Sequence, residues 1–372
     1  MILLSVRISP FKWIFPFSLF LFSFVCEART YDSYVSYSSK GAFCSAIGGA
    51  CASDTDMISG CFQNPASIKA GEPDFDFDGD YVKSDNPEPG VKPSHNRSEN
   101  SFLGAVAWGG EKWGFGIGLS GKNTSVHTTT TILDGQGNSI STPYSSKGQS
   151  FTFYLSAAFR YSENLSLGLS MVDLYHSESV STELYGNAKA SPSKNYIGLP
   201  GFTLGAIYLY DSHWRFGLWL RTPSEYTTQL EIGSFTESIR LYNPLIVEPG
   251  LSYMPWADDR TLLFDLKFIG TTKNAYLLTY DDFASENVYD PSLQRKGQEV
   301  SLEPRIGWRS KMGRKSDFSY MAGSYWEDIR LSNVKGRLHF TAGLTYQPLH
   351  WLEAMVGFDV SNNFFQTLVT FR

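Results

Sequence analysis

Four aspartates alternate with apolar residues in the stretch PDFDFDGDYV, and their spacing fits a metal site. Asp74, Asp76, Asp78 and Gly79 match the start of a calcium-binding loop, in which carboxylates surround the ion and glycine turns the chain. The twelfth position of such a loop is a glutamate, but here it is the shorter Asp85, and prolines stand where the flanking helices belong. The calcium interpretation therefore fits the opening of the loop and fails at its close.

A β-strand is the second interpretation of the same stretch, and it needs no metal. Successive side chains of a strand point to opposite faces, so all four aspartates share one face. The other face carries the remaining alternate residues, Phe75, Phe77, Gly79 and Tyr81. Such a strand requires water on one side and apolar surroundings on the other. The rest of the chain favours this strand over the calcium loop.

The first 28 residues have the layout of a cleaved secretory signal peptide. Two basic residues precede an apolar run from Trp13 to Val25, and a small residue stands at each of the positions one and three before a cut after Ala28. The alternative is a lipoprotein signal cut before Cys26, but Phe24 and Val25 are bulky where small residues are usual. We expect residues 1–28 to be removed on export.

The composition of the remaining chain suits a protein that meets two solvents. Aromatic residues make up 15% and charged residues only 18%, against roughly 25% charged in ordinary globular domains. Removal of Arg7, Lys12 and Glu27 leaves 29 basic and 36 acidic side chains, a formal charge of −7, which gives no indication of nucleic-acid binding. Beyond residue 28 no apolar run reaches 18 residues, so the exported chain is predicted to be soluble or a β-barrel.

Polar connections that alternate between short and long divide the chain into fourteen predicted strands between Asp74 and Phe371. Short turns and long external loops alternate in this way in outer-membrane barrels. The predicted long loops are 84–100, 121–148, 176–198, 233–243, 271–297 and 327–335. We expect these loops outside the cell and the short turns in the periplasm.

Several predicted strands have one apolar and one polar face. In WRFGLWLR, Trp214, Phe216 and Leu218 oppose the face of Arg215 and Arg221. The segments 262–268 and 300–309 alternate in the same way, with charged residues opposite large apolar ones. A secreted β-sandwich or soluble barrel also alternates, but its core interleaves small and large residues. The rows of large residues favour a lipid-facing surface.

Residues 36–70 differ from the strands, because they are rich in small residues and glycine and lack a period of two. Gly48, Gly49, Asp54, Asn64 and Pro65 stand in this segment, in the runs GGA, ASD and NPA. With WRFGLWLRTPSEY and NPLIVEPGLSYMPWADDRTLLFDLKF further on, this order of motifs resembles the long-chain fatty-acid transporter family of outer membranes, the FadL/TodX type. Thr222 replaces the serine usual in that family.

The resemblance implies an all-β fold, a transmembrane antiparallel β-barrel of about 14 strands with an N-terminal plug inside it. Residues 29–72 are then the hatch and residues 73–372 the barrel. The implied function is passive diffusion of long-chain fatty acids or similar apolar compounds across the outer membrane. We expect a monomer whose partners are membrane lipid and apolar cargo, with no nucleic acid. The alternatives are a general diffusion porin and a non-transporting structural or surface barrel.

Positive side chains on the wet face offer a binding site for an anionic head group. Arg221 is the first candidate, because it lies in the segment that resembles the family, and Arg215 is the second. A guanidinium can bind a carboxylate in two places. The alternative is a structural network of paired charges, and the aspartates of the first strand favour neutral cargo over an anion.

Catalytic and cofactor patterns are missing from the sequence. The six histidines have no metal-ligand spacing, and neither a G-x-S-x-G elbow nor a phosphate-binding loop occurs. Cys44, Cys51 and Cys61 match neither a redox pair nor a zinc site, so either two of them pair or all are small buried residues. We expect no cofactor, no metal and no enzymatic activity, with a barrel lipase as the alternative.

Overall fold

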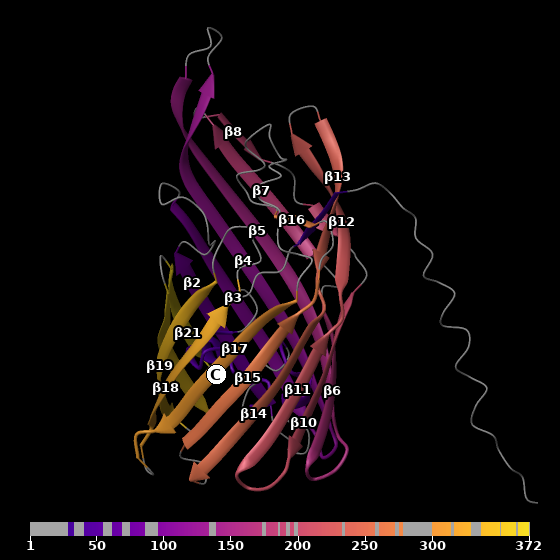
Figure 1. The fold of residues 1–372 in the computed structure, drawn as a ribbon, viewed down its shortest axis with the longest axis vertical. Helices are drawn as coiled ribbons and strands as arrows, with labels where there is room; N and C mark the ends of the chain where they lie inside the picture. Colours follow the sequence, from indigo (N-terminus) through magenta and orange to yellow (C-terminus); the bar gives the residue numbers. More distant parts are fainter. Residues whose placement is uncertain are drawn as a thin grey trace, which may run out of the picture.

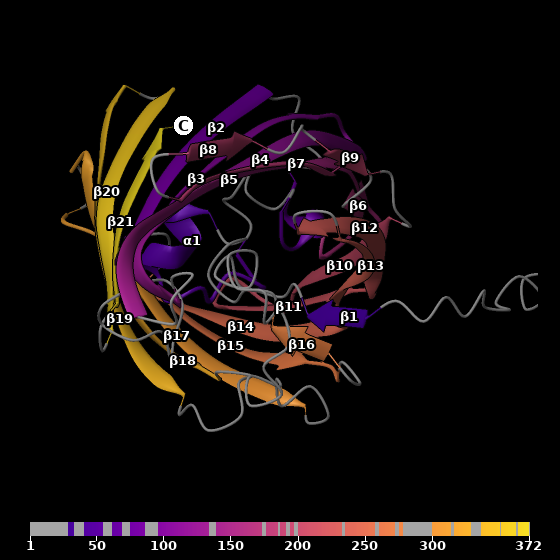
Figure 2. The same ribbon diagram turned by 90° about the horizontal axis from the view of Figure 1, so that it is seen from above.

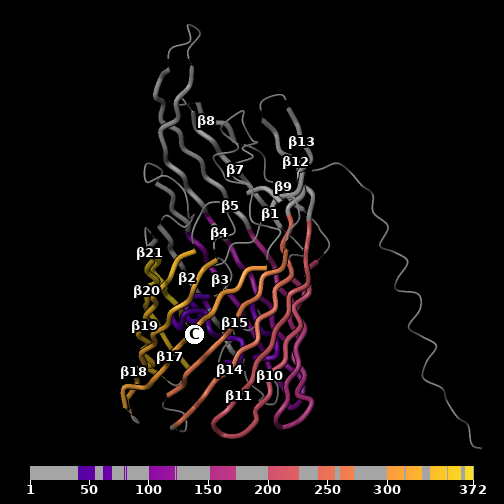
Figure 3. Tube along the Cα trace, in the orientation of Figure 1, coloured from indigo at the N-terminus to yellow at the C-terminus, as the bar shows by residue number. Residues whose placement is uncertain are grey.

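The structure of the chain is a computed structural model (Figure 1). It describes residues 29–32, 41–54, 62–68, 75–85, 96–133, 139–172, 176–184, 187–190, 194–196, 200–232, 235–256, 260–271, 275–277, 300–313, 316–328, 336–349, 351–361 and 364–371. The predicted signal peptide, Cys61, Asp74 and most of 271–297 lie outside these residues. Figure 3 shows the same trace, with the segments of uncertain placement in grey.

Fourteen of the described strands are long or regular enough to form the main wall of the molecule. They are β2 (Phe75–Asp85), β3 (Asn96–Gly109), β4 (Trp113–Leu133), β5 (Ser139–Arg160), β6 (Leu165–Val172), β10 (Gly201–Leu209), β11 (Trp214–Arg221), β14 (Ile246–Trp256), β15 (Arg260–Ile269), β17 (Ser301–Lys311), β18 (Phe318–Glu327), β19 (Arg337–Leu349), β20 (Leu352–Ser361) and β21 (Phe364–Phe371). The chain is therefore all-β, as the sequence predicted, and most of it lies in one antiparallel sheet.

The wall strands pair with their neighbours in chain order, always antiparallel. β2 pairs with β3 on one side, and on its other side it pairs with β21, the last strand, with Gly79 opposite Phe371. β6 pairs directly with β10 across the intervening segment, and β11 pairs with β14. Figure 2 shows the resulting arrangement from above.

Three loops predicted from the sequence consist largely of strand. Residues 121–148 are not a loop, because β4 and β5 continue as a paired hairpin until Leu133 lies opposite Ser139. Threonine and serine dominate this region, and threonine is well suited to strands although it is polar. The predicted loop 176–198 likewise contains strands β7 (His176–Leu184), β8 (Asn187–Ala190) and β9 (Lys194–Tyr196).

A second, smaller sheet forms from the long connections. β12 (Ser224–Ile232) pairs with β13 (Phe235–Asn243), so the predicted loop 233–243 is mostly strand. β1 (Arg29–Asp32) adds in parallel to β13 and to β16 (Ala275–Leu277). β1 begins at the residue that follows the predicted signal cleavage site. This sheet lies at the end of the molecule opposite the short turns (Figure 1).

The short turns at the other end have their own side-chain caps. In the turn between β10 and β11, Asp211 Oδ1 accepts hydrogen bonds from the backbone N–H groups of His213 (2.7 Å) and Trp214 (2.8 Å). These two bonds favour the charged carboxylate and lower the pKa of Asp211. The four residues of the turn, Tyr210 to His213, therefore connect the two strands without a glycine.

The two faces of the wall strands follow the predicted alternation. On β15, Asp265 and Lys267 are buried, whereas Phe264 and Leu266 between and beside them are exposed. On β11, Phe216 and Leu218 are exposed and Trp219 is buried. Charged residues thus point inward and large apolar residues outward, the reverse of a soluble protein. No helix among the described residues is long and apolar enough to cross a membrane.

Residues Phe75 to Asp85 form strand β2, as the strand interpretation of PDFDFDGDYV requires. Tyr81 is exposed on the face assigned to the aromatic residues, and its hydroxyl donates to Asn100 Oδ1. The side chains of the four aspartates lie outside the described part of the structure. Their orientation toward water stays a prediction.

Candidate functional site: the buried N-terminal segment

Residues 41–54 and 62–68, here called the N-terminal segment, lie inside the circle of wall strands, where Figure 2 shows helix α1 (Ala42–Ala46). Their side chains are almost completely buried. α1 lies against β2 and β18 to β21, and the 3-10 helix η2 (Pro65–Ser67) lies against β5, β6 and β10. The hatch residues predicted from the sequence all belong to this segment.

Small residues and two glycines let the segment turn sharply after α1. Gly48 and Gly49 have φ values of 68° and 72°, a left-handed conformation that side chains with a Cβ rarely adopt. The Gly49 N–H returns to the carbonyl of Cys44 at 2.7 Å, which closes the turn. These are the positions at which the sequence has two consecutive glycines.

A disulfide between Cys44 and Cys51 staples this turn, with the two Cα atoms 6.0 Å apart. The sequence left the pairing open, and the structure selects this pair because the glycine turn brings the two residues together. Closing so short a loop stabilises the folded segment by about 2–3 kcal/mol on loop-closure entropy.

We therefore expect two disulfide-bonded cysteines and one thiol in the mature chain. Alkylation in denaturant should modify one cysteine before reduction and all three after it. Peptide mapping should identify the first site as Cys61. Three modified cysteines without reductant would show that the bond does not form.

Glycines of the wall provide the surface on which the segment lies. A Cβ built on Gly217 would come within 2.0 Å of the Ala52 carbonyl oxygen, and one on Gly323 within 2.3 Å of the Gly48 nitrogen. Further wall glycines whose Cβ would meet the segment are Gly168, Gly205, Gly250, Gly307 and Gly343. Backbone of the segment therefore lies directly against backbone of the wall, which only glycine permits.

Asn64 and Pro65 join the two halves of the segment to each other and to the wall. Asn64 Nδ2 donates to the carbonyl of Ala52 (2.6 Å), and its Oδ1 accepts from the N–H of Ala66 (3.1 Å). Pro65 is the first residue of η2, where its missing N–H costs nothing. A Cβ on Gly205 would overlap Asn64 Oδ1. The Asn-Pro-Ala motif is thus the point at which the segment packs against β6 and β10.

Polar side chains of β15, β17 and β19 fix the other half of the segment. Asp265 Oδ2 accepts the N–H of Ala52 at 2.7 Å, and Thr341 Oγ1 both accepts from Gly48 N–H and donates to Ala46 O. Asp54 forms an ion pair with Arg309 at 3.2 Å. Asp54, predicted from the sequence as a hatch residue, therefore contacts the wall directly.

The contacts of Asp265, Arg309 and Thr341 with the N-terminal segment are here called the charged anchor. Arg305 connects this anchor to two buried carboxylates. Its Nη1 donates to Gly49 O (3.1 Å) and to Glu248 Oε1 (3.2 Å), and its Nη2 to Glu303 Oε2 (2.7 Å). All three charged side chains are almost fully buried. Buried charges of this kind are stable only when they are paired, so Arg305 couples the position of the segment to the wall.

The opposite side of the segment rests on an apolar surface. Phe62 packs edge-to-face on Tyr154, with ring centroids 4.8 Å apart. Phe62 and Ile68 belong to one buried cluster with residues of β3, β5 and β6, namely Leu103, Ala105, Ala107, Tyr154, Ala158 and Val172. Toward β3, β5 and β6 the segment is therefore held by apolar contacts, whereas toward β15, β17 and β19 it is held by charges and hydrogen bonds together with a second apolar cluster that includes Phe43, Ile47, Leu263 and Met321.

The two predicted ligand residues occupy different places on β11. Arg221 Nη2 donates to the Phe62 carbonyl (3.3 Å), and its Nε donates to Thr203 Oγ1 (3.4 Å). Arg215 lies near the short-turn end, where its Nη2 is 3.9 Å from Met254 Sδ. Arg221 thus contacts the N-terminal segment, whereas Arg215 has no described contact with it. A ligand role for either residue stays a prediction.

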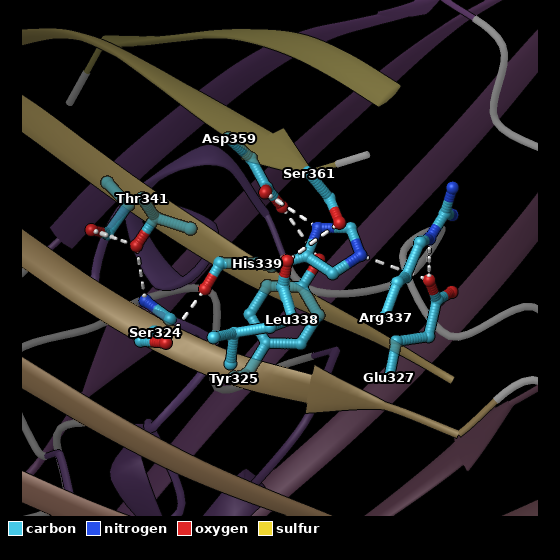
Figure 4. Close-up of polar contacts among 11 residues, drawn as sticks. Ser324, Tyr325, Glu327, Arg337, Leu338, His339, Thr341, Asp359 and Ser361 are labelled. Atoms are coloured by element: carbon cyan, nitrogen blue, oxygen red, sulfur yellow. Dashed lines mark hydrogen bonds and ion pairs between the residues drawn. The ribbon is translucent and has the colours of Figure 1, made fainter. Parts of the chain in front are cut away.

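A second buried polar network, which sequence reasoning did not find, joins β18, β19 and β20 (Figure 4). His339 Nδ1 lies 2.8 Å from Asp359 Oδ1, and Nε2 lies 3.0 Å from Glu327 Oε2. Arg337 pairs with Glu327, and the Tyr325 hydroxyl donates to Asp359 Oδ2 at 2.6 Å. No spacing rule in the sequence predicts contacts across three strands.

The second network consists of hydrogen bonds and ion pairs between buried side chains. Both ring nitrogens of His339 face carboxylates, and the nearby Ser324 hydroxyl donates to the His339 backbone carbonyl instead of the ring. Among the described residues, no group of three or more histidine, cysteine or acidic side chains has the arrangement of a metal site. Neither observation points to a nucleophile or a cation.

By sequence, the chain matches no protein-family model and no curated protein. By structure, it is similar to the Ralstonia pickettii toluene transporter TbuX, with a TM-score of 0.61 over 91% of this chain and 98% of that one, at 13% identity. The Pseudomonas putida toluene transporter TodX gives 0.59 over 92% and 99%, at 15% identity. A Pseudomonas aeruginosa FadL homologue gives 0.58 over 90% and 96%, at 11% identity.

The chain has the FadL/TodX-type fold. The resemblance seen in short sequence motifs is thereby confirmed for the fold, along nearly the whole chain. In this FadL/TodX-type fold the candidate site consists of the glycine turn, the Asn-Pro-Ala motif packed against the wall, and the charged anchor. Identities of 11–15% carry no information about the cargo.

Proposed function

We propose that the protein is an outer-membrane channel for hydrophobic small molecules, in which the wall strands form a closed transmembrane barrel and the N-terminal segment is its plug. The observation that carries the proposal is the segment's burial against inward-facing wall residues, with its backbone on wall glycines. A segment tied by individual hydrogen bonds and charges to several strands can block a lumen and still be displaced.

The outward face supports a location in a bilayer. Exposed aromatic residues gather beside the short turns, among them Trp113, Tyr161, Tyr210, Phe318 and Trp351. Beyond them along the strands lie exposed aliphatic and phenylalanine side chains such as Ile117, Leu218 and Phe264. An apolar band with an aromatic girdle at its edge is typical of outer-membrane barrels. The short turns then face the periplasm.

The proposed cargo is an uncharged or weakly polar apolar compound, either a monoaromatic hydrocarbon or a fatty acid. Two of the similar structures are described as toluene transporters, and another as a FadL homologue. Displacement of the plug would expose the apolar side chains of the cluster around Phe62, which carry no charge. No energy-coupling element is required for diffusion down a gradient.

Reconstitution into vesicles tests the function against the porin alternative. Wild-type protein should speed the entry of toluene or of a long-chain fatty acid while showing little ion conductance, because the plug fills the lumen. Empty vesicles and vesicles with a general porin are the controls. High, weakly selective conductance by the wild type, or no acceleration of either compound, would contradict the proposal.

Substitution of Arg221 tests whether the cargo is a fatty acid or a neutral compound. If its guanidinium receives the head group, Arg221→Ala should reduce fatty-acid entry several-fold more than toluene entry. Arg215→Ala, on the same face of β11 but away from the segment, is the matched control. Equal losses for both compounds would assign Arg221 to holding the Phe62 carbonyl alone.

A further inference from the structure

The ring of Phe62 points from the N-terminal segment into the wall, and only 3% of this residue is exposed. Two ring atoms at the end remote from the backbone, Cε1 and Cζ, lie 2.7 Å and 2.8 Å from the position that a Cβ on Gly118 would take. A side chain at residue 118 would therefore occupy part of the space that the ring fills. The ring reaches this depth in the wall because β4 has a glycine there.

The strand register places an aromatic residue on one side of Gly118 and a small residue on the other. Gly118 pairs with Tyr154 on β5 and with Ala105 on β3. The rings of Phe62 and Tyr154 meet at 80°, which brings the positive edge of one aromatic ring to the negative face of the other. The space bounded by these three wall residues is here called the ring slot. Its geometry favours a flat aromatic ring over a saturated ring of similar size.

The surroundings of the ring slot are apolar. The side chains that form a cluster with Phe62 carry no formal charge, and Arg221 approaches Phe62 at its backbone carbonyl. The other phenylalanine among the described residues of the segment, Phe43, lies 5.8 Å from the guanidinium carbon of Arg309. Of the two phenylalanine positions, the ring slot is therefore the one that suits an uncharged aromatic molecule.

We propose that the ring slot is a binding site for a monosubstituted benzene ring, and that Phe62 occupies it until cargo displaces the plug. From Cβ outward, the side chain of phenylalanine is toluene with one hydrogen replaced by the backbone. Toluene can therefore fill the same space and make the same contact with Tyr154. The inference rests on the proposed function and names an aromatic hydrocarbon, not a fatty acid, as the cargo.

Phe62 competes with cargo for the ring slot, because both present the same chemical group. A ring that is tethered to the chain competes at a high effective concentration. Toluene should therefore bind more weakly to the wild type than to a variant without the Phe62 ring. Weaker binding in the resting protein also allows the cargo to leave the slot again when the plug returns.

Photolabelling of the full-length protein in lipid vesicles tests the ring slot. The probe is a phenyl diazirine, a monosubstituted benzene that inserts into neighbouring side chains when it is illuminated. Mass spectrometry should locate the label on the buried Tyr154 and on its neighbour Leu155, which is exposed on the opposite face. Excess toluene should reduce the label on Tyr154 several-fold relative to Leu155. The same amount of methylcyclohexane, which is not flat or aromatic, should have a much smaller effect.

Three variants place the probe at the slot. Phe62→Ala should raise the labelling of Tyr154 several-fold, because the competing ring is gone. Adding Gly118→Val to Phe62→Ala should remove this gain, because the new side chain fills the slot. Phe43→Ala is the matched control, since it removes a ring of equal size from the other half of the segment. It should leave the ratio of Tyr154 to Leu155 labelling at the wild-type value.

Several results would overturn the ring slot. One is a wild type in which Tyr154 is not labelled, and another is equal competition by toluene and methylcyclohexane. A third is an equal rise of Tyr154 labelling in Phe43→Ala and Phe62→Ala, which would indicate general loosening of the segment. If Phe62→Ala fails to fold, competition in the wild type alone decides.

Failure of the channel function is distinguishable from failure of the slot. Vesicles that take up toluene no faster than empty ones, but in which toluene protects Tyr154 from the probe, would refute transport and leave the binding site in place. Accelerated toluene entry without protection of Tyr154 would overturn the ring slot and leave the channel function in place.

Discussion

Gly217→Val should yield a folded protein whose N-terminal segment is displaced from β11, with ion conductance raised several-fold over the wild type. The Cβ of any other residue would stand 2.0 Å from the Ala52 carbonyl oxygen and 2.3 Å from its carbon. Both atoms belong to backbone, so a rotamer change cannot relieve the overlap. The segment must move, because β11 is held by paired strands on both sides.

Single-channel recording in planar bilayers measures this effect, and hydrogen exchange of residues 47–54 reports the displacement independently. Gly313→Val is the matched control, since a Cβ at Gly313 meets no atom within 4 Å. It should behave as the wild type. Unchanged conductance in Gly217→Val with raised exchange would mean that the segment does not block the lumen. Unchanged exchange would mean that it does not lie on Gly217.

His339→Ala should lower the free energy of unfolding by about 3–5 kcal/mol, the usual cost of removing one partner from a buried charge network. The two carboxylates that flank the ring, Glu327 and Asp359, would then remain buried with Arg337 and Tyr325 as their described partners. The lost stacking of His339 on Tyr325, at 4.3 Å between ring centroids, adds to the effect.

Reversible urea unfolding in lipid vesicles, followed by tryptophan fluorescence, gives the free energy. His213→Ala is the control, because His213 is exposed in a short turn and lies 3.9 Å from Asp211. An exposed pair of this kind contributes little to stability, because water screens the two charges. Equal stability of the two variants would show that the second network contributes no more than a surface contact.

Alternation by itself determined the fold class and the two faces of the strands. A period of two needs no long-range information, because each side chain's face follows from its position in the strand. Rows such as Phe264 and Leu266 opposite Asp265 and Lys267 therefore predicted the outward and inward faces correctly. The loop predicted at 121–148 was wrong, because a polar strand pair in a long hairpin resembles a loop in sequence.

The motifs of the N-terminal segment were also legible in the sequence. Gly48, Gly49, Asp54, Asn64 and Pro65 all lie in the segment that the structure buries. Two consecutive glycines indicate a turn with positive φ, and a proline after asparagine indicates an extended start, because both are local backbone effects. The sequence did not show which residues each of them contacts.

Only the tertiary structure decided which residues meet. Ala52 and Asp265 are 213 positions apart, and Arg305 and Gly49 are 256 apart. Such pairs depend on the stagger between neighbouring strands, and a shift of one residue would turn every side chain to the other face. The contacts of the wall glycines with the N-terminal segment follow from that register, because each requires two segments to approach at one fixed height inside the molecule.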